Sequence, residues 1–297
     1  MAEFETRRIA LPTGVELNAA TAGDPAKPAI ILLHGFPESH RTWRHQILAL
    51  AADHYVIAPD QRGYGGSSKP DGVEHYTADK PVADLMALAD ALDIKRFTLV
   101  GHDWGGAIAW MAALHHPLRV KRLVILNAPH PKLFQQSLFD DPDQRKASQY
   151  INLFRDTRID QGLTGRGLER FFSSHFAQLV VGTIAGEEKA RYLADWGQPG
   201  AMTAMLNWYR ASDFVVPEPG EEAAKPLWLH APFPPVLQPT LVIWGMKDEA
   251  LLPVQLEGLG AVAPRAKIVR IEDAGHFVTW EQPDAVNAAL LDWLSAA

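Results

Sequence analysis

The chain has 297 residues, of which 28 are lysine or arginine and 35 are aspartate or glutamate, so the net charge is −7 with histidine neutral. This acidity argues against a nucleic-acid-binding protein, which needs a clustered basic surface to neutralise phosphates. A hydrophobic content of 47% is typical of a globular protein, and the absence of cysteine excludes disulfides and thiolate metal sites.

Short apolar, β-branched runs alternate with amphipathic stretches along most of the chain. Two runs near 7–11 and 16–21, joined by the turn at 12–14, predict an antiparallel edge. The other runs predict strands buried on both faces of a parallel sheet, at 29–33, 55–59, 97–100, 123–126, 240–244 and 267–271. Helices are predicted at 43–52, 78–92, 104–115, 254–262 and 283–294. This alternation predicts an α/β fold with a mostly parallel eight-stranded sheet flanked by helices.

The alternation is interrupted once, between residues 131 and 226. Strand patterns are absent there, and the sequence is helix-compatible and rich in Phe, Trp, Tyr and Arg. We interpret 131–226 as a helical insertion in a core domain formed by 1–130 and 227–297. Seven prolines between Pro217 and Pro239 exclude a regular helix throughout that stretch and indicate a stiff return path to the sheet.

The strongest functional pattern is Gly-His-Asp-Trp-Gly-Gly at 101–106, which lies between a predicted strand and a predicted helix. This is the pattern of a nucleophile elbow, with Asp103 in place of the commoner serine. A side chain at Gly101 or Gly105 would collide across so sharp a turn. An aspartate at a helix N-terminus stays ionised and able to attack carbon. The alternative, an aspartate that only caps the helix, leaves the flanking glycines unexplained.

The tetrapeptide His-Gly-Phe-Pro at 34–37 directly follows the strand at 29–33. Gly35 and Pro37 fix an unusual loop, and we expect it to point the backbone N–H of Phe36 into the site beside that of Trp104. Two such donors form an oxyanion hole for a tetrahedral intermediate. Taken alone, the tetrapeptide also fits an ordinary loop, so this prediction depends on the order of the other motifs.

Two later strands end in the residues that complete a triad. Asp248 follows the strand at 240–244, and His276 follows the strand at 267–271. Nucleophile, acid and histidine then occur in the order found along α/β-hydrolase chains. Because open α/β sheets place ligands at the carboxyl ends of their strands, we predict that Asp103, Asp248 and His276 meet there.

These motifs resemble those of a known family. From about Arg7 to Leu294 the chain is similar to the soluble, bacterial-type epoxide hydrolases of the α/β-hydrolase fold. The resemblance rests on the segments at 34–37, 63–68, 101–106 and 275–277. It implies that the insertion is a helical lid between the sixth and seventh strands, and that two lid tyrosines act as acids. Tyr150 and Tyr209 stand in matching contexts, with Tyr192 as the substitute for Tyr150. The alternative for either tyrosine is a side chain that only packs in the lid.

The resemblance also implies a reaction that needs neither a metal nor an organic cofactor. Asp103 attacks one epoxide carbon while Tyr150 and Tyr209 bind the epoxide oxygen and protonate it. His276, oriented by Asp248, then activates a water that hydrolyses the ester. The backbone N–H groups of Phe36 and Trp104 hold the oxyanion, and the product is a vicinal diol.

The expected location follows from what the sequence lacks. The first residues contain no apolar run of the length that a signal peptide needs, and no stretch approaches the length of a membrane span. We therefore expect a cytoplasmic detoxification enzyme whose partner is a small hydrophobic epoxide. We expect no nucleic-acid or membrane partner, and a homodimer is left open.

Two other functions fit parts of the same pattern. A haloalkane dehalogenase shares the aspartate nucleophile and uses a tryptophan at the position of Trp104 as a halide donor. Those enzymes resemble one another in having Asn or Glu where Phe36 stands, which disfavours this alternative. The fold also serves small-molecule receptors without catalysis. The intact set of Asp103, Asp248 and His276 disfavours a receptor.

Overall fold

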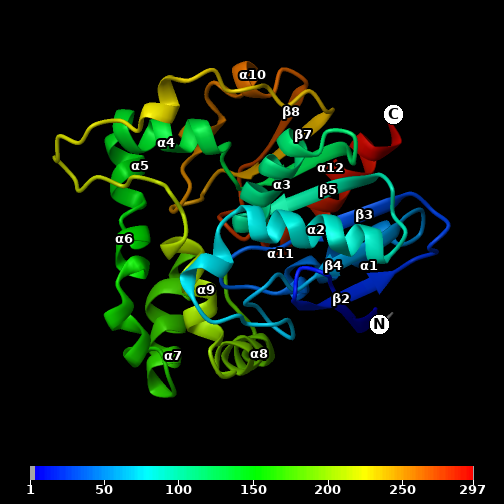
Figure 1. Cartoon of the computed structure of the whole chain (residues 1–297), viewed down its shortest axis with the longest axis horizontal. Coiled ribbons are helices and arrows are strands. Elements are labelled where there is room, and N and C mark those ends of the chain that lie inside the picture. The colour runs from blue at the N-terminus through cyan, green and yellow to red at the C-terminus, as the bar shows by residue number, and fades with distance from the viewer. Residues whose placement is uncertain (1–3, 297) are drawn as a thin grey trace.

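The computed structural model of the chain describes residues 4–296. Residues 1–3 and 297, the ends of the expected core domain, lie outside the described residues. One sheet lies at the centre (Figure 1), and its eight strands follow the order β1-β2-β4-β3-β5-β6-β7-β8. The strands are β1 (Glu5–Ala10), β2 (Glu16–Ala22), β3 (Ala29–Leu33), β4 (Tyr55–Pro59), β5 (Phe97–His102), β6 (Val120–Leu126), β7 (Thr240–Gly245) and β8 (Ala266–Ile271).

The sheet is mostly parallel. Strand β2 pairs antiparallel with both β1 and β4, which forms the expected antiparallel edge. All other neighbouring strands are parallel. The predicted fold class is therefore confirmed. Because β3, β5, β6, β7 and β8 run in one direction, the loops that follow them meet at one edge of the sheet.

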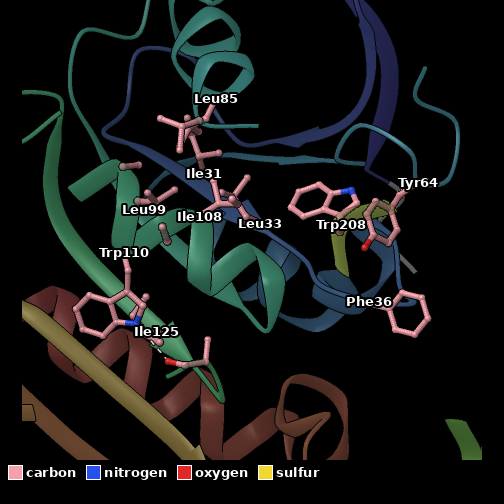
Figure 2. Close-up of a cluster of buried hydrophobic side chains, with 14 of the residues drawn as sticks. Ile31, Leu33, Phe36, Tyr64, Leu85, Leu99, Ile108, Trp110, Ile125 and Trp208 are labelled. Atoms are coloured by element: carbon pink, nitrogen blue, oxygen red, sulfur yellow. Dashed lines mark hydrogen bonds between the residues drawn. The ribbon is translucent and has the colours of Figure 1, made fainter. Parts of the chain in front are cut away.

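Helices cover both faces of the sheet. Helices α2 (Asp79–Ala91) and α3 (Trp104–His115) pack on one face, and α1 (Arg44–Leu50), α11 (Val278–Glu281) and α12 (Pro283–Ser295) pack on the other. Successive strand residues contribute to opposite faces, as the period of a strand requires. Figure 2 shows Ile31, Leu99 and Ile125 from three neighbouring strands together with Ile108 and Trp110 of α3.

The predicted helix at 254–262 is wrong. Pro253–Leu256 form only a short 3-10 turn, and α10 spans Leu259–Val262. Between them, Gly258 has a φ of +75°, in the left-handed region through which a right-handed helix cannot continue. The other predicted helices agree with the observed ones to within two residues at each end.

The chain between β6 and β7 is helical. No residue from 131 to 226 lies in a strand, and in Figure 1 this segment forms a layer beside the sheet. We propose 131–226 as the lid. Its helices are α4 (Pro131–Asp140), α5 (Pro142–Ala147), α6 (Tyr150–Arg155), α7 (Arg166–Phe171), α8 (Gly186–Trp196) and α9 (Ala201–Arg210). None of the helices within residues 4–296 is long and apolar enough to cross a lipid bilayer.

Two tryptophans tie this helical layer to the core. The indole N–H of Trp208 in α9 donates to the backbone oxygen of Arg62 at 3.1 Å. The indole N–H of Trp196 in α8 donates to the backbone oxygen of Pro37 at 2.7 Å. Both indoles are almost completely buried, so each satisfies its only polar group at a core loop.

Candidate active site

Asp103 lies at a strained turn between β5 and α3. Its backbone φ is 51° and its ψ is −124°, a combination that L residues rarely adopt. A Cβ at Gly101 would lie 2.4 Å from the backbone oxygen of Gly105, and a Cβ at Gly105 would lie 2.2 Å from that of Leu33. These close approaches explain why glycines flank the turn, and the arrangement is that of a nucleophile elbow.

We expect Gly105→Ala to destabilise the fold by about 1–3 kcal/mol, because the added methyl group meets rigid backbone of β3. Urea unfolding measures the change. Gly260→Ala is the matched control, since a Cβ there meets nothing within 4 Å, and its free energy of unfolding should stay the same or rise slightly. Equal unfolding midpoints for wild type and Gly105→Ala would contradict the steric argument.

Two backbone donors converge on the carboxylate of Asp103. The N–H of Phe36 donates to its Oδ1 at 2.7 Å, and the N–H of Trp104 also lowers the pKa of this carboxyl group. These are the two groups expected to form an oxyanion hole. Because the N–H of Phe36 already bonds Oδ1, it is positioned for a negative charge that develops on the same oxygen.

His276 links the other two triad residues. Its Nδ1 lies 2.8 Å from Oδ2 of Asp248, in a buried hydrogen bond. Its Nε2 lies 3.6 Å from Oδ2 of Asp103, a charge–charge contact longer than a hydrogen bond. The loops after β5, β7 and β8 thus bring the three side chains together, as the order of the motifs indicates.

The carboxylate of Asp248 has further donors. Its Oδ1 accepts the backbone N–H groups of Ala250 and Leu251, both at 2.9 Å. Its Oδ2 accepts the side-chain amide of Asn127 at 2.8 Å in addition to His276. Our sequence analysis did not single out Asn127. Its position in the sequence could have pointed to it, because Asn127 is a polar residue directly after β6, at the sheet edge where the other site residues lie.

The charges of Asp103 and His276 influence each other's protonation state. Burial alone would raise the pKa of Asp103, but the adjacent, positively charged His276 and the N–H of Trp104 hold that pKa below its ordinary value. Burial alone would lower the pKa of His276, but the carboxylates of Asp248 and Asp103 raise it well above the ordinary value. At neutral pH the free protein therefore holds a carboxylate beside an imidazolium.

A cavity of about 280 Å³ opens onto these groups. Asp103 and His276 line it from the core, while Tyr150 and Tyr209 line it from helices α6 and α9. Most of the remaining wall is apolar or aromatic and includes Phe36, Pro37, Phe154, Phe171, Phe176 and Phe277. A smaller pocket of about 40 Å³ also reaches Asp103, Tyr150 and Tyr209. Such walls favour an apolar ligand.

The two tyrosines are uncharged phenols, of which Tyr209 is buried and Tyr150 is half-buried. Their ring centroids lie 6.0 Å apart, and the ring of Tyr209 contacts those of Phe36 and Trp104, each at 5.2 Å. Burial and the negative charge of Asp103 raise the pKa of both hydroxyls far above the ordinary value. Each hydroxyl therefore keeps its proton in the free protein.

Tyr192 does not take the place of Tyr150. Its hydroxyl donates to Oε1 of Glu38 at 2.7 Å, and its side chain is not part of the cavity wall. The indole N–H of Trp280 donates to the same oxygen at 2.9 Å. The hydroxyl of Tyr192 thus links α8 to the core.

His102 supports the site from behind. Its Nε2 lies 2.8 Å from the backbone oxygen of His276, and the side chain is fully buried. Burial and the neighbouring His276 lower the pKa of His102 to about 4, so the ring is neutral at pH 7. Among residues 4–296, no group of three or more His, Asp or Glu side chains is arranged to hold a metal ion.

Comparison with known proteins identifies the family of this chain. The model of the alpha/beta hydrolase fold matches residues 28–283. The chain belongs to the α/β-hydrolase family. This α/β-hydrolase is 34% identical to Epoxide hydrolase A of Mycobacterium tuberculosis, over 98% of this chain and 97% of that protein.

Solved structures give the same result for this α/β-hydrolase. One, described as novel epoxide hydrolases of the α/β-hydrolase superfamily from metagenomes of hot environments, is 45% identical, covers 99% of both chains and has a TM-score of 0.86. The Bacillus megaterium epoxide hydrolase, solved in complex with an inhibitor, is 29% identical with a TM-score of 0.85, over 97% of this chain and 100% of that one. The resemblance expected from the motifs is confirmed over nearly the whole chain.

Proposed function

We propose that this α/β-hydrolase is an epoxide hydrolase that forms vicinal diols through a covalent ester on Asp103. The observation that carries the proposal is one apolar cavity holding an ionised carboxylate and two neutral phenols. Several alkyl substrates suit a carboxylate nucleophile, but an epoxide also needs a proton on the oxygen that leaves carbon. The cytoplasmic location stays a prediction, and the homodimer stays open.

In the first half of the reaction, Asp103 opens the ring. Its Oδ1 is held by the N–H of Phe36, so Oδ2 is the oxygen free to attack. The new bond joins Oδ2 to one epoxide carbon, the bond from that carbon to the ring oxygen breaks, and Tyr150 or Tyr209 gives its proton to that oxygen. A phenol suits this step because it is intrinsically more acidic than the alcohol that forms, and because ester formation removes the negative charge of Asp103 that helps to raise the pKa of both hydroxyls.

In the second half, His276 activates water. The ester carries no negative charge at Asp103, so one interaction that raises the pKa of His276 is lost, and its proton returns through solvent to the tyrosinate. Neutral His276 then takes a proton from water as the water oxygen bonds to Cγ of Asp103. The oxyanion forms at Oδ1, which Phe36 and Trp104 stabilise. The bond between Cγ and Oδ2 then breaks as protonated His276 gives its proton to Oδ2, which releases the diol and leaves the carboxyl group of Asp103 to ionise again.

The surroundings of Phe36 disfavour the dehalogenase alternative. Its ring packs against Phe154 and Tyr209, with centroids 5.2 Å away in each case. A departing halide ion needs donors on this wall, and a phenyl ring has none. It also needs no proton, so a dehalogenase would make no use of the two phenols as acids.

We expect the two half-reactions to respond differently to pH. Ester formation needs ionised Asp103, whose pKa is held low, so its rate constant persists into acid. Ester hydrolysis needs neutral His276, so its rate constant falls as pH drops through the imidazole pKa of the ester, which lies below that of the free enzyme. Single-turnover measurements from about pH 5 to pH 9 separate the two steps. If both rate constants fell over the same acidic pH range, the roles assigned to Asp103 and His276 would be contradicted.

An isotope experiment tests the proposed function. Enzyme in excess over styrene oxide in ¹⁸O-water should yield unlabelled diol on the first turnover and ¹⁸O in the peptide that contains Asp103, because water attacks the ester carbonyl. With 1-bromobutane we expect no bromide. Label in the first diol but not in the peptide would show direct attack of water on the epoxide. Release of bromide would favour a dehalogenase. No product from either substrate would favour a receptor.

A further inference from the structure

We propose that Asn127 is a positioning residue that controls, through Asp248, how readily His276 acts as the base in ester hydrolysis. This inference rests on the proposed function. Asn127 is fully buried at the end of β6 and does not line the cavity around Asp103. Its contacts show what it does there.

Asn127 holds a backbone conformation that few residues adopt. Its φ is 38°, in the left-handed region, where asparagine is one of the better-tolerated side chains. Its side-chain Oδ1 accepts the backbone N–H of Gly245 at 2.8 Å. An N–H donor at that position fixes which end of the amide is oxygen. The amide nitrogen must then face Asp248.

The amide nitrogen bonds the oxygen of Asp248 that matters for the histidine. It donates to Oδ2 at 2.8 Å, and the same Oδ2 lies 2.8 Å from Nδ1 of His276. The other oxygen is already engaged by Ala250 and Leu251. Asn127 therefore holds the carboxylate of Asp248 in the rotamer that faces His276. Its amide N–H also stabilises part of the negative charge on that carboxylate.

Loss of this donor would change the histidine rather than the nucleophile. A carboxylate with fewer donors binds the imidazolium form of His276 more strongly. Neutral His276 would then form only at higher pH. The other titratable groups around the pair are unchanged by a substitution at Asn127, and they are Asp103, His102, Glu281, Tyr150 and Glu249.

The test is Asn127→Gly, which tolerates the positive φ and removes only the side chain. We expect ester formation to keep its wild-type rate constant while ester hydrolysis at neutral pH falls about tenfold, the size expected for one hydrogen bond to a charged group. The acid limb of kcat should move about one pH unit to the alkaline side. KM should fall together with kcat, because the ester accumulates.

The matched control is Asn18→Ala. Asn18 also donates its side-chain amide to a buried carboxylate, Oδ2 of Asp60 at 2.9 Å, but this pair lies outside the cavity. It should leave the pH profile unchanged. An unmoved acid limb in Asn127→Gly, or equal losses in both half-reactions, would assign Asn127 a purely structural role and overturn the proposal.

A second measurement does not depend on epoxide turnover. Nitrogen-15 NMR of the histidine rings in the substrate-free protein follows the titration of His276, whose signals are identified by their loss in His276→Gln. Asn127→Gly should raise this pKa above that of the wild type, and an equal or lower value would overturn the proposal. A wild type that opens no epoxide would instead reject the proposed function, while the NMR result still decides the role of Asn127.

Discussion

His276→Gln is expected to stop turnover after a single ring opening and to leave the substrate attached to Asp103. Glutamine cannot accept the proton of the attacking water, so hydrolysis of the ester should slow by about 10² to 10⁴-fold, the usual contribution of a general base. Asp103 keeps its donors from Phe36 and Trp104, so it still attacks the epoxide. Mass spectrometry should find one substrate mass added to the peptide that contains Asp103.

The matched control for this variant is His175→Gln. His175 lines the same cavity and stacks on Phe171, but neither Asp103 nor Asp248 contacts it. This variant should turn over without an adduct. If His276→Gln binds the epoxide yet carries no added mass, the covalent scheme is incorrect.

The double variant Tyr150→Phe with Tyr209→Phe is expected to lose ring opening by about 10² to 10⁴-fold, since no acid remains beside the epoxide oxygen. Phenylalanine keeps the ring contacts of Tyr209 with Phe36 and Phe154, so the cavity should retain its shape. Each single variant should lose less, because one donor remains. Rapid-quench measurement of ester formation gives the rate constants.

Tyr192→Phe provides the comparison for the two tyrosines. It removes a half-buried lid hydroxyl that donates to Glu38 rather than into the cavity. Ring opening should remain close to the wild-type rate, although the lid loses a contact and the thermal midpoint should fall. Wild-type ring opening in the double variant would reject Tyr150 and Tyr209 as the acids.

The elbow could be predicted because its causes are local. The steric demand at Gly101 arises from the backbone of Gly105 and Gly106 within the same turn, so it leaves a readable pattern in the sequence. The buried strands could be predicted for a similar reason, because residues that face helices on both sides must be apolar. The prediction failed for 254–262, where one glycine with positive φ outweighed the helical periodicity.

Other parts of the site depend on contacts between distant segments. The bond from Asn127 to Asp248 spans 121 residues, and no local pattern marks its two ends as partners. The choice between Tyr150 and Tyr192 is of the same kind, since both lie on amphipathic lid helices. Only the packing of α6 and α8 decides which hydroxyl reaches the cavity.

Trp208 anchors α9 to the core, so the lid tyrosine that takes part in the reaction and the residues that shape much of the cavity wall lie on different segments. Trp208 is bonded to Arg62 in the core, and its neighbour Tyr209 is thereby held over Asp103. The stretch 171–179 supplies much of the remaining wall but no proton donor to the proposed reaction. Evolution, natural or directed, can therefore reshape that stretch for new substrates while the reacting groups keep their geometry.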